Sequence, residues 1–175
     1  MPDLFVTSDT HFNHAATIFS FKRKDGTPLR DFSSVEEMNE TLISRWNSVV
    51  KPNSKVYHLG DVAMKESELH HLGRLNGHLR LILGNHDTGD YRKYAQYFEA
   101  IYSSRLLDRM IFTHIPIHPE SLGKNKANVH GHVHYMPELS YGPRYLNVSV
   151  EMTDYYPVSL EDIKKKVQLQ IGETW

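Results

Sequence analysis

The chain has 175 residues, of which 39% are hydrophobic and 23% are charged, and it contains no cysteine. This composition is typical of a globular domain and excludes wholesale disorder, while the lack of thiols excludes disulfide scaffolds, thiolate metal sites and thiol catalysis. The 20 basic residues against 21 acidic residues give a net charge of −1, which argues against a protein that binds duplex DNA by charge.

Histidine is the unusual component of the chain, with 12 copies. It is the commonest metal ligand and the side chain that titrates nearest to neutral pH, so its placement needs an explanation. The sequence starts without the basic and apolar regions of a secretory signal, and it never reaches the roughly 20 consecutive apolar residues that span a bilayer. We therefore expect a cytoplasmic protein without a membrane partner.

In chain order, short apolar strands alternate with segments whose apolar residues recur at helical spacing. The predicted elements are a strand at 4–7, a loop excursion at about 21–33, a helix at 34–49, a strand at 56–59, a short helix at 67–75, a strand at 79–83, a helix at 90–98, strands at 110–113, 128–130 and 145–150, and a last helix that Ser159 caps. This alternation predicts a single α/β domain over residues 1–175, with two sheets sandwiched between helices.

Polar side chains that bind metals follow these strands. Ligands of open α/β folds gather at the carboxyl ends of strands, so we expect these side chains to converge at one rim. In an extended segment, a spacing of two residues would also put both members of a pair on the same side. Seven oxygen and nitrogen ligands suit two ions of manganese, iron, zinc or nickel, bridged by one carboxylate. The predicted ligands are Asp9, His11, Asp61, Asn85, His114, His132 and His134.

The order of these residues resembles the five motifs of the calcineurin-like metallophosphoesterases. The resemblance covers about residues 4–150, and the chain is most similar to the small, stand-alone phosphoesterases of bacteria and phages. It implies a four-layer α/β/β/α sandwich of two mixed sheets. The motifs stand here as Asp9-Thr-His11, Gly60-Asp61, Gly84-Asn85-His86-Asp87, His114 and Gly131-His132-Val133-His134.

The resemblance also implies a role for each of these residues. One ion would be held by Asp9, His11 and His134, and the other by Asn85, His114 and His132. Asp61 would bridge the two ions together with a hydroxide that attacks the phosphorus. His86 would be the general acid that protonates the leaving oxygen. The implied cofactor is a pair of divalent ions, with manganese favoured over iron, zinc or nickel.

Several other residues near the motifs have two interpretations each. Asn13 and His14 either open a helix or contact substrate phosphate, and Asp87 contacts substrate, orients a neighbour or finishes a turn. Arg144 contacts either substrate or backbone. The histidines outside the motifs include His58, predicted to be a hydrogen-bonded core residue, and His130, which either supports a ligand or packs. The basic residues of the excursion are predicted to form a solvated face, with steering of an anionic substrate as the alternative: Lys22, Arg23, Lys24 and Arg30.

The leading functional hypothesis is a phosphodiesterase or phosphomonoesterase that acts on small phosphate esters or nucleotides, as a monomer or homodimer. One alternative is a nuclease acting on single-stranded ends. Stable binding of duplex nucleic acid is not expected, because no residues are left for a domain that would grip it. The other alternative is a catalytically idle binding scaffold with the same fold.

Overall fold

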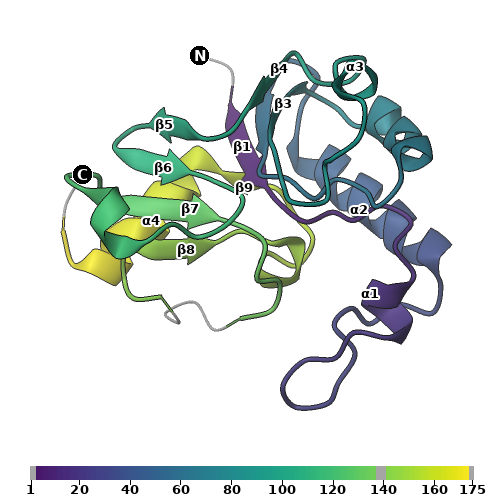
Figure 1. Ribbon diagram of the computed structural model, residues 1–175, viewed down its shortest axis with the longest axis horizontal. Coiled ribbons are helices and arrows are strands. Elements are labelled where there is room, and N and C mark those ends of the chain that lie inside the picture. Colours follow the sequence, from purple (N-terminus) through teal and green to yellow (C-terminus); the bar gives the residue numbers. More distant parts are fainter. Residues whose placement is uncertain (1–2, 137–140, 174–175) are drawn as a thin grey trace.

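The computed structural model describes residues 3–136 and 141–173, and it contains two mixed β-sheets with few helices (Figure 1). The first sheet has the order β4-β3-β2-β1-β9, and only β9 is antiparallel to its neighbour. Its strands are β1 (Leu4–Thr7), β2 (Lys55–His58), β3 (His78–Ile82), β4 (Ala100–Tyr102) and β9 (Val158–Ser159). The α/β class with two sheets is therefore as predicted.

The second sheet has the order β5-β6-β7-β8, in which β5 is the antiparallel edge strand. Its strands are β5 (Arg105–Leu107), β6 (Met110–Phe112), β7 (Ala127–His130) and β8 (Tyr145–Asn147). The two sheets meet where β1 and β8 end, because Ser8 forms a parallel bridge with Ser149. The loops that follow the parallel strands of both sheets therefore begin close to one another, at the carboxyl ends of these strands.

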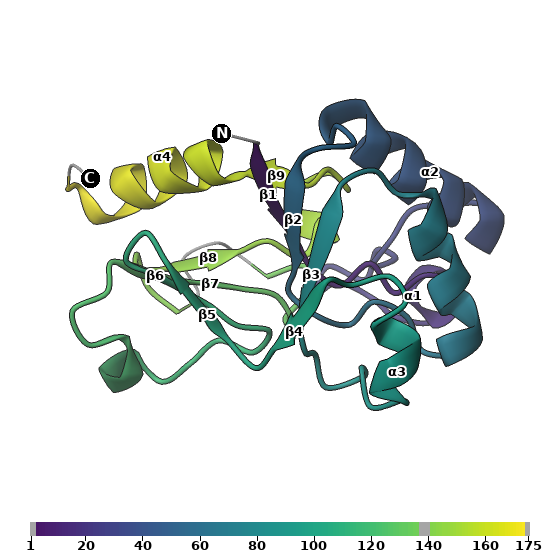
Figure 2. The same ribbon diagram turned by 90° about the horizontal axis from the view of Figure 1, so that it is seen from above.

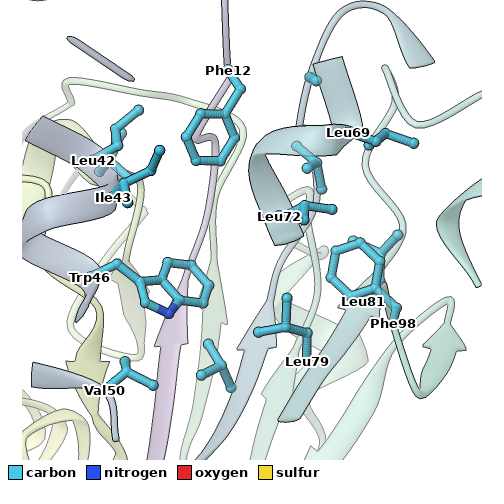
Figure 3. Packing of buried hydrophobic residues seen from close by; sticks show 14 of the residues in the cluster. Phe12, Leu42, Ile43, Trp46, Val50, Leu69, Leu72, Leu79, Leu81 and Phe98 are labelled. Atoms are coloured by element: carbon cyan, nitrogen blue, oxygen red, sulfur yellow. The ribbon is translucent and has the colours of Figure 1, made fainter. Parts of the chain in front are cut away.

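One face of the first sheet is covered by helices (Figures 1 and 2). These are α2 (Val35–Val49), the 3₁₀ helix η1 (Glu66–Arg74) and α3 (Tyr91–Tyr94). Their apolar side chains form a cluster with the sheet in which Trp46 of α2 and Leu72 of η1 lie near Leu79 of β3 (Figure 3). Trp46 is buried there, and truncating a buried tryptophan to alanine typically costs about 3–5 kcal/mol.

The second cluster lies in the angle between the two sheets. Successive residues of a strand point to opposite faces, so Phe5 joins the helical cluster while Val6 joins this one. The C-terminal helix α4 (Leu160–Ile171) contributes Ile163 and Val167 to the same cluster. Figure 2 shows α4 beside β9 and the second sheet. Because α4 closes the space between the sheets, the predicted four-layer α/β/β/α sandwich is not confirmed.

Other predicted elements differ in detail from the structure. The helix at 34–49 is present, and Ser34 caps it by accepting a hydrogen bond from Glu37 N. The helix predicted at 90–98 is helical only at α3, and the strand predicted at 145–150 ends at Asn147. The helix considered to open at residues 13 and 14 is α1 (Ala16–Phe19). Elements that the sequence did not predict are η2 (Pro119–Leu122), η3 (Val150–Met152) and strands β4, β5 and β9. No helix within residues 3–136 or 141–173 is long and apolar enough to cross a bilayer.

Candidate metal centre

The predicted ligands lie on backbone with unusual conformations. Within the described residues, ten non-glycine residues have a positive φ, and five of them are predicted ligands. These are Asp9 (60°), His11 (45°), Asp61 (57°), His132 (72°) and His134 (48°). The pairs 9/11 and 132/134 therefore do not lie in extended segments, contrary to the expectation from their spacing. A left-handed conformation costs a non-glycine residue on the order of 1–3 kcal/mol, and such strain concentrates at functional sites.

The first group of ligands consists of Asp9, His11 and His134, whose ligand atoms lie within 4.8 Å of one another. Burial raises the pKa of the Asp9 carboxyl group, which accepts hydrogen bonds from His132 N (2.9 Å) and the Ser149 hydroxyl (2.9 Å). The His11 ring is also buried, and neither of its nitrogens has a hydrogen-bond partner among the described residues.

The second group consists of Asp61, His114 and His132, with the same 4.8 Å limit between ligand atoms. Asn85 joins this group, because its Oδ1 lies 2.9 Å from His114 Nε2. The same nitrogen lies 3.3 Å from Asp61 Oδ2 and 3.3 Å from His132 Nδ1. The structure thus brings all seven predicted ligands into two neighbouring groups.

Asp61 lies between the two groups. Its Oδ2 is 3.5 Å from His11 Nε2 of the first group and 3.3 Å from His114 Nε2 of the second. Burial opposes ionisation of Asp61, but the hydrogen bond and charge of His114 outweigh it and hold the pKa of the carboxyl group well below its ordinary value. Asp61 is therefore a carboxylate at neutral pH, in the place where a shared ligand would stand.

The donor set fits divalent cations. His114 Nδ1 lies 2.7 Å from the carbonyl oxygen of Leu59 and must donate to it, so the neutral ring carries its lone pair on Nε2. Nε2 faces the acceptor oxygens of Asn85 and Asp61, so either a proton on the charged ring or a cation between these atoms balances them. A cation can replace that proton, and oxygen and imidazole ligands suit manganese, iron, zinc or nickel.

Two glycines of the motifs allow the ligand segments to approach one another. A Cβ atom on Gly84 would collide with the carboxylate and backbone nitrogen of Asp61. A Cβ atom on Gly131 would collide with the Asp9 carboxylate and the Ser8 hydroxyl. Glycine is therefore required at both places by the packing of one ligand segment against the next.

Asp87 supports the site from behind rather than facing a substrate. It is buried, and its carboxylate accepts hydrogen bonds from Asp61 N (2.8 Å), Val62 N (3.1 Å) and Gly84 N (2.9 Å). Burial raises the pKa of Asp87, while these backbone donors oppose that rise. The structure therefore corrects its assignment as a substrate contact: Asp87 holds the turn that carries Asp61.

Arg144 also differs from its assignment as a substrate contact. It lies just before β8, at the amino end of this strand, whereas the ligands follow the carboxyl ends of the strands. Its side chain donates to the carbonyl oxygens of Gly123 (3.1 Å) and Asn125. Its role is to hold the loop before β7. His130 packs likewise: its Nδ1 lies 3.0 Å from Gly131 O, and its ring lies 6.1 Å from that of Tyr145.

Two imidazoles lie beside the first group of ligands. The ring centroids of His14 and His86 are 5.3 Å and 5.7 Å from that of His11, and His86 is exposed. The backbone N–H of His86 donates to Asp61 Oδ1 (2.9 Å), which fixes this histidine next to the shared carboxylate. Asn13 is exposed next to His14, and its backbone nitrogen bonds to Asn39 Oδ1 (3.0 Å). The helix expected to begin at these residues starts only at Ala16.

The excursion contains the residue whose environment differs most from its prediction. Arg30 is fully buried instead of solvated, and it forms an ion pair of 2.7 Å with Glu151. Burial alone would raise the pKa of Glu151, but Arg30 and a hydrogen bond from His134 hold it at about 2. Arg23 lies 4.1 Å over the ring of Tyr135, so the excursion also contacts the turn after His134. Lys22 and Lys24 are exposed, as predicted.

Sequence reasoning missed Glu151 altogether. Its partner Arg30 is 121 positions away, and neither residue belongs to a motif. The available signal was that Glu151 directly follows the strand predicted at 145–150, as several predicted ligands follow theirs. That signal does not distinguish a buried acid that supports a ligand from an exposed one.

Comparison with known proteins places the chain in a family. No family model matches it. The uncharacterized protein MJ1445 of Methanocaldococcus jannaschii is 37% identical over 179 residues, which cover 96% of this chain and 93% of that protein. The gene 66 protein of Mycobacterium phage L5 is 34% identical over 93 residues, covering 50% of this chain and 41% of that protein.

A solved structure supports the same relationship at the level of the fold. The crystal structure of AQ665 from Aquifex aeolicus, a protein of unknown function, matches with a TM-score of 0.74 and 26% identity, covering 94% of this chain and 99% of that chain. The two chains therefore share their fold over nearly the whole length of both. Because the identity to MJ1445 also extends over nearly all of both proteins, the chain belongs to the family of MJ1445.

Proposed function

We propose that this protein is a metal-dependent hydrolase of phosphate esters that works with two divalent ions. The observation that carries the proposal is the convergence of seven oxygen- and nitrogen-bearing side chains into two neighbouring groups that share Asp61. His114 Nε2 faces the oxygens of Asn85 and Asp61, and the nitrogens of His11 are buried without hydrogen-bond partners among the described residues. The five motifs that resemble those of the calcineurin-like metallophosphoesterases support the same conclusion.

The chain's own residues divide between the two ions. Asp9, His11 and His134 would hold the first, Asn85, His114 and His132 would hold the second, and Asp61 would be shared. When bound, two such ions lower the pKa of water toward neutrality and stabilise charge on a phosphate that is being attacked. Manganese is the proposed metal, because the ligands are carboxylate, amide and imidazole without sulfur; iron, zinc and nickel are the alternatives.

The negative charge of the ligand carboxylates explains why the site needs cations to bind a phosphate ester. When ionised, the Asp9 and Asp61 carboxylates bring two negative charges to the site, and both are buried. A phosphate dianion would be repelled by that pair. Two divalent ions reverse the sign of the field, so that the same site attracts a phosphate ester.

His86 is the proposed general acid. It is exposed beside the first group, with its backbone fixed by Asp61 Oδ1, so its ring can reach a leaving oxygen without serving as a ligand. Protonation of an alkoxide leaving group by such a histidine is worth about 10²–10⁴-fold in rate. His14 lies on the other flank of His11 and is proposed to donate a hydrogen bond to a phosphate oxygen.

The experiment is a metal titration coupled to turnover. The protein is stripped with chelator, dialysed against manganese, zinc, nickel or magnesium in turn, and analysed for bound metal and for hydrolysis of p-nitrophenyl phosphate and bis(p-nitrophenyl) phosphate. Two ions per chain and metal-dependent release of p-nitrophenol are expected. Two bound ions without turnover would favour the idle scaffold, and cleavage restricted to a single-stranded oligonucleotide would favour the nuclease. Failure to bind two ions at saturating manganese would refute the proposal.

A further inference from the structure

The two groups of ligands are supported by different kinds of partner. In the second group, His114 Nδ1 is held by a backbone carbonyl, that of Leu59, at 2.7 Å. In the first group, His134 Nδ1 lies 3.1 Å from the carboxylate of Glu151. A buried charge therefore stands behind one group, and a neutral peptide group stands behind the other.

Arg30 holds this carboxylate in place. The Arg30 and Glu151 side chains are both fully buried, and Glu151 Oε1 accepts from Arg30 Nε (2.8 Å) with Arg30 Nη2 at 2.7 Å. The same guanidinium donates from Nη1 to Thr10 O (2.8 Å) and from Nη2 to Asp9 O (2.5 Å). One side chain of the excursion thus binds both the backbone that carries Asp9 and the acid behind His134.

The pairing fixes the tautomer of His134. A carboxylate bonded to a guanidinium accepts hydrogen bonds and donates none, so His134 Nδ1 must be the donor in its contact with Glu151. The lone pair of the neutral ring is then on Nε2, which leaves that nitrogen to bind a cation. A carboxylate behind a metal-binding histidine also makes the imidazole a stronger ligand, and removing such a partner typically weakens metal binding 10–100-fold.

We infer that Glu151 is a positioning residue for the first ion alone, and that Arg30 of the excursion is the clamp that holds it. The inference rests on the proposed function, because it presumes that both ligand groups bind ions. It adds an asymmetry that the motifs do not contain: the first ion depends on a buried ion pair, whereas the second depends on a backbone carbonyl.

The test measures each ion separately by equilibrium dialysis against manganese. His132→Ala leaves the first group complete, and His134→Ala leaves the second group complete. We expect Glu151→Gln to weaken manganese binding 10–100-fold in the His132→Ala background and by less than about 2-fold in the His134→Ala background. The control is Glu40→Gln, which removes an exposed carboxylate paired with Arg74 and should change neither affinity.

Two further measurements keep the outcome interpretable. Circular dichroism reports whether Glu151→Gln still folds, since it leaves Arg30 without its counter-charge. Glu151→Asp retains that charge on a shorter side chain, and it should weaken only the first ion, by less than Glu151→Gln does. Equal weakening of both ions, or no weakening of the first by either variant, would overturn the inference. Absence of manganese binding by the unsubstituted protein would instead refute the proposed function, and the inference with it.

Discussion

Acidification should destabilise the fold through His58, which is buried at the end of β2, three residues before Asp61. The Thr10 hydroxyl donates to Val62 O (3.0 Å), so it must accept from His58 Nε2 (2.9 Å). His58 Nδ1 accepts from Gly60 N (3.2 Å). Both bonds require the neutral ring, because a proton on Nδ1 would face the N–H of Gly60.

The magnitude follows from the pKa of this histidine. Burial and the charge of His114 lower the pKa of His58 from 6.5 to about 3. The unfolded chain therefore takes up the proton first, and stability is lost as the pH falls below 6.5 until it reaches about 3. Each pH unit in this window is worth about 1.4 kcal/mol, so His58 alone should cost about 2 kcal/mol at pH 5 relative to pH 7.5.

The assay is urea unfolding of the metal-free protein at pH 7.5, 6.5, 5.5 and 5.0, with His58→Gln as the comparison. The variant should be less stable at pH 7.5, yet it should lose about 2 kcal/mol less than the unsubstituted protein between pH 7.5 and pH 5. Other titrating groups cancel in this difference. His70→Gln, at an exposed position of η1, should keep the original slope. Parallel slopes for His58→Gln and the unsubstituted protein would refute the reasoning.

Three further predictions concern the metal centre. Asp61→Ala should lose both ions together in the dialysis assay, and retention of two tightly bound ions would contradict its shared position. His86→Ala should keep both ions but slow the hydrolysis of an alkyl ester about 10²–10⁴-fold, with a smaller loss for a p-nitrophenyl ester, whose leaving group needs no proton; equal losses would remove its role as the acid. Gly84→Ala should abolish ion binding because its Cβ collides with Asp61, whereas Gly73→Ala, whose Cβ meets only the Tyr97 ring at 3.7 Å, should retain it in the same dialysis assay.

The predicted ligands could be found in the sequence because each one is local to a strand end. Asp9, Asp61 and His114 all closely follow a short apolar run, and the parallel register then brings those ends to one edge. Nothing more than strand order and side-chain type is needed for that prediction. The left-handed backbone that turns these side chains together was not predictable, since aspartate and histidine, unlike glycine, adopt it only at a steric cost.

The parts that sequence reasoning missed depend on contacts between distant segments. Arg30 stands in a run of basic residues typical of a solvated surface, and only the folded chain brings it to Glu151. Strands β4, β5 and β9 have three, three and two residues, which is too few to show an alternation of apolar and polar residues. They form because a neighbouring strand has unpaired backbone groups to which they can hydrogen-bond. The position of α4 beside β9 and the second sheet likewise depends on how the two sheets pack, which the order of elements along the chain does not determine.

The strained backbone at the ligands must be stabilised by the ligands' own surroundings. Five left-handed ligand residues at about 1 kcal/mol or more each amount to about 5 kcal/mol, comparable with the whole stability of a small domain. Glycine would relieve that strain but would remove the side chain that the site requires.

The structure instead makes each ligand segment hold another. The Asp9 carboxylate binds the backbone N–H of His132, Asp87 binds that of Asp61, and Asp61 binds that of His86. Protonation removes the charge of such a carboxylate and weakens the bonds that it accepts, so the geometry of the site and the charge that binds cations depend on the same ionised groups. Acid should therefore release the ions and loosen these contacts, with Asp9 and Asp87, whose pKa burial raises, protonated before Asp61, whose pKa is lowered. A metal-binding curve and circular dichroism, both followed from pH 7.5 downward, check this order.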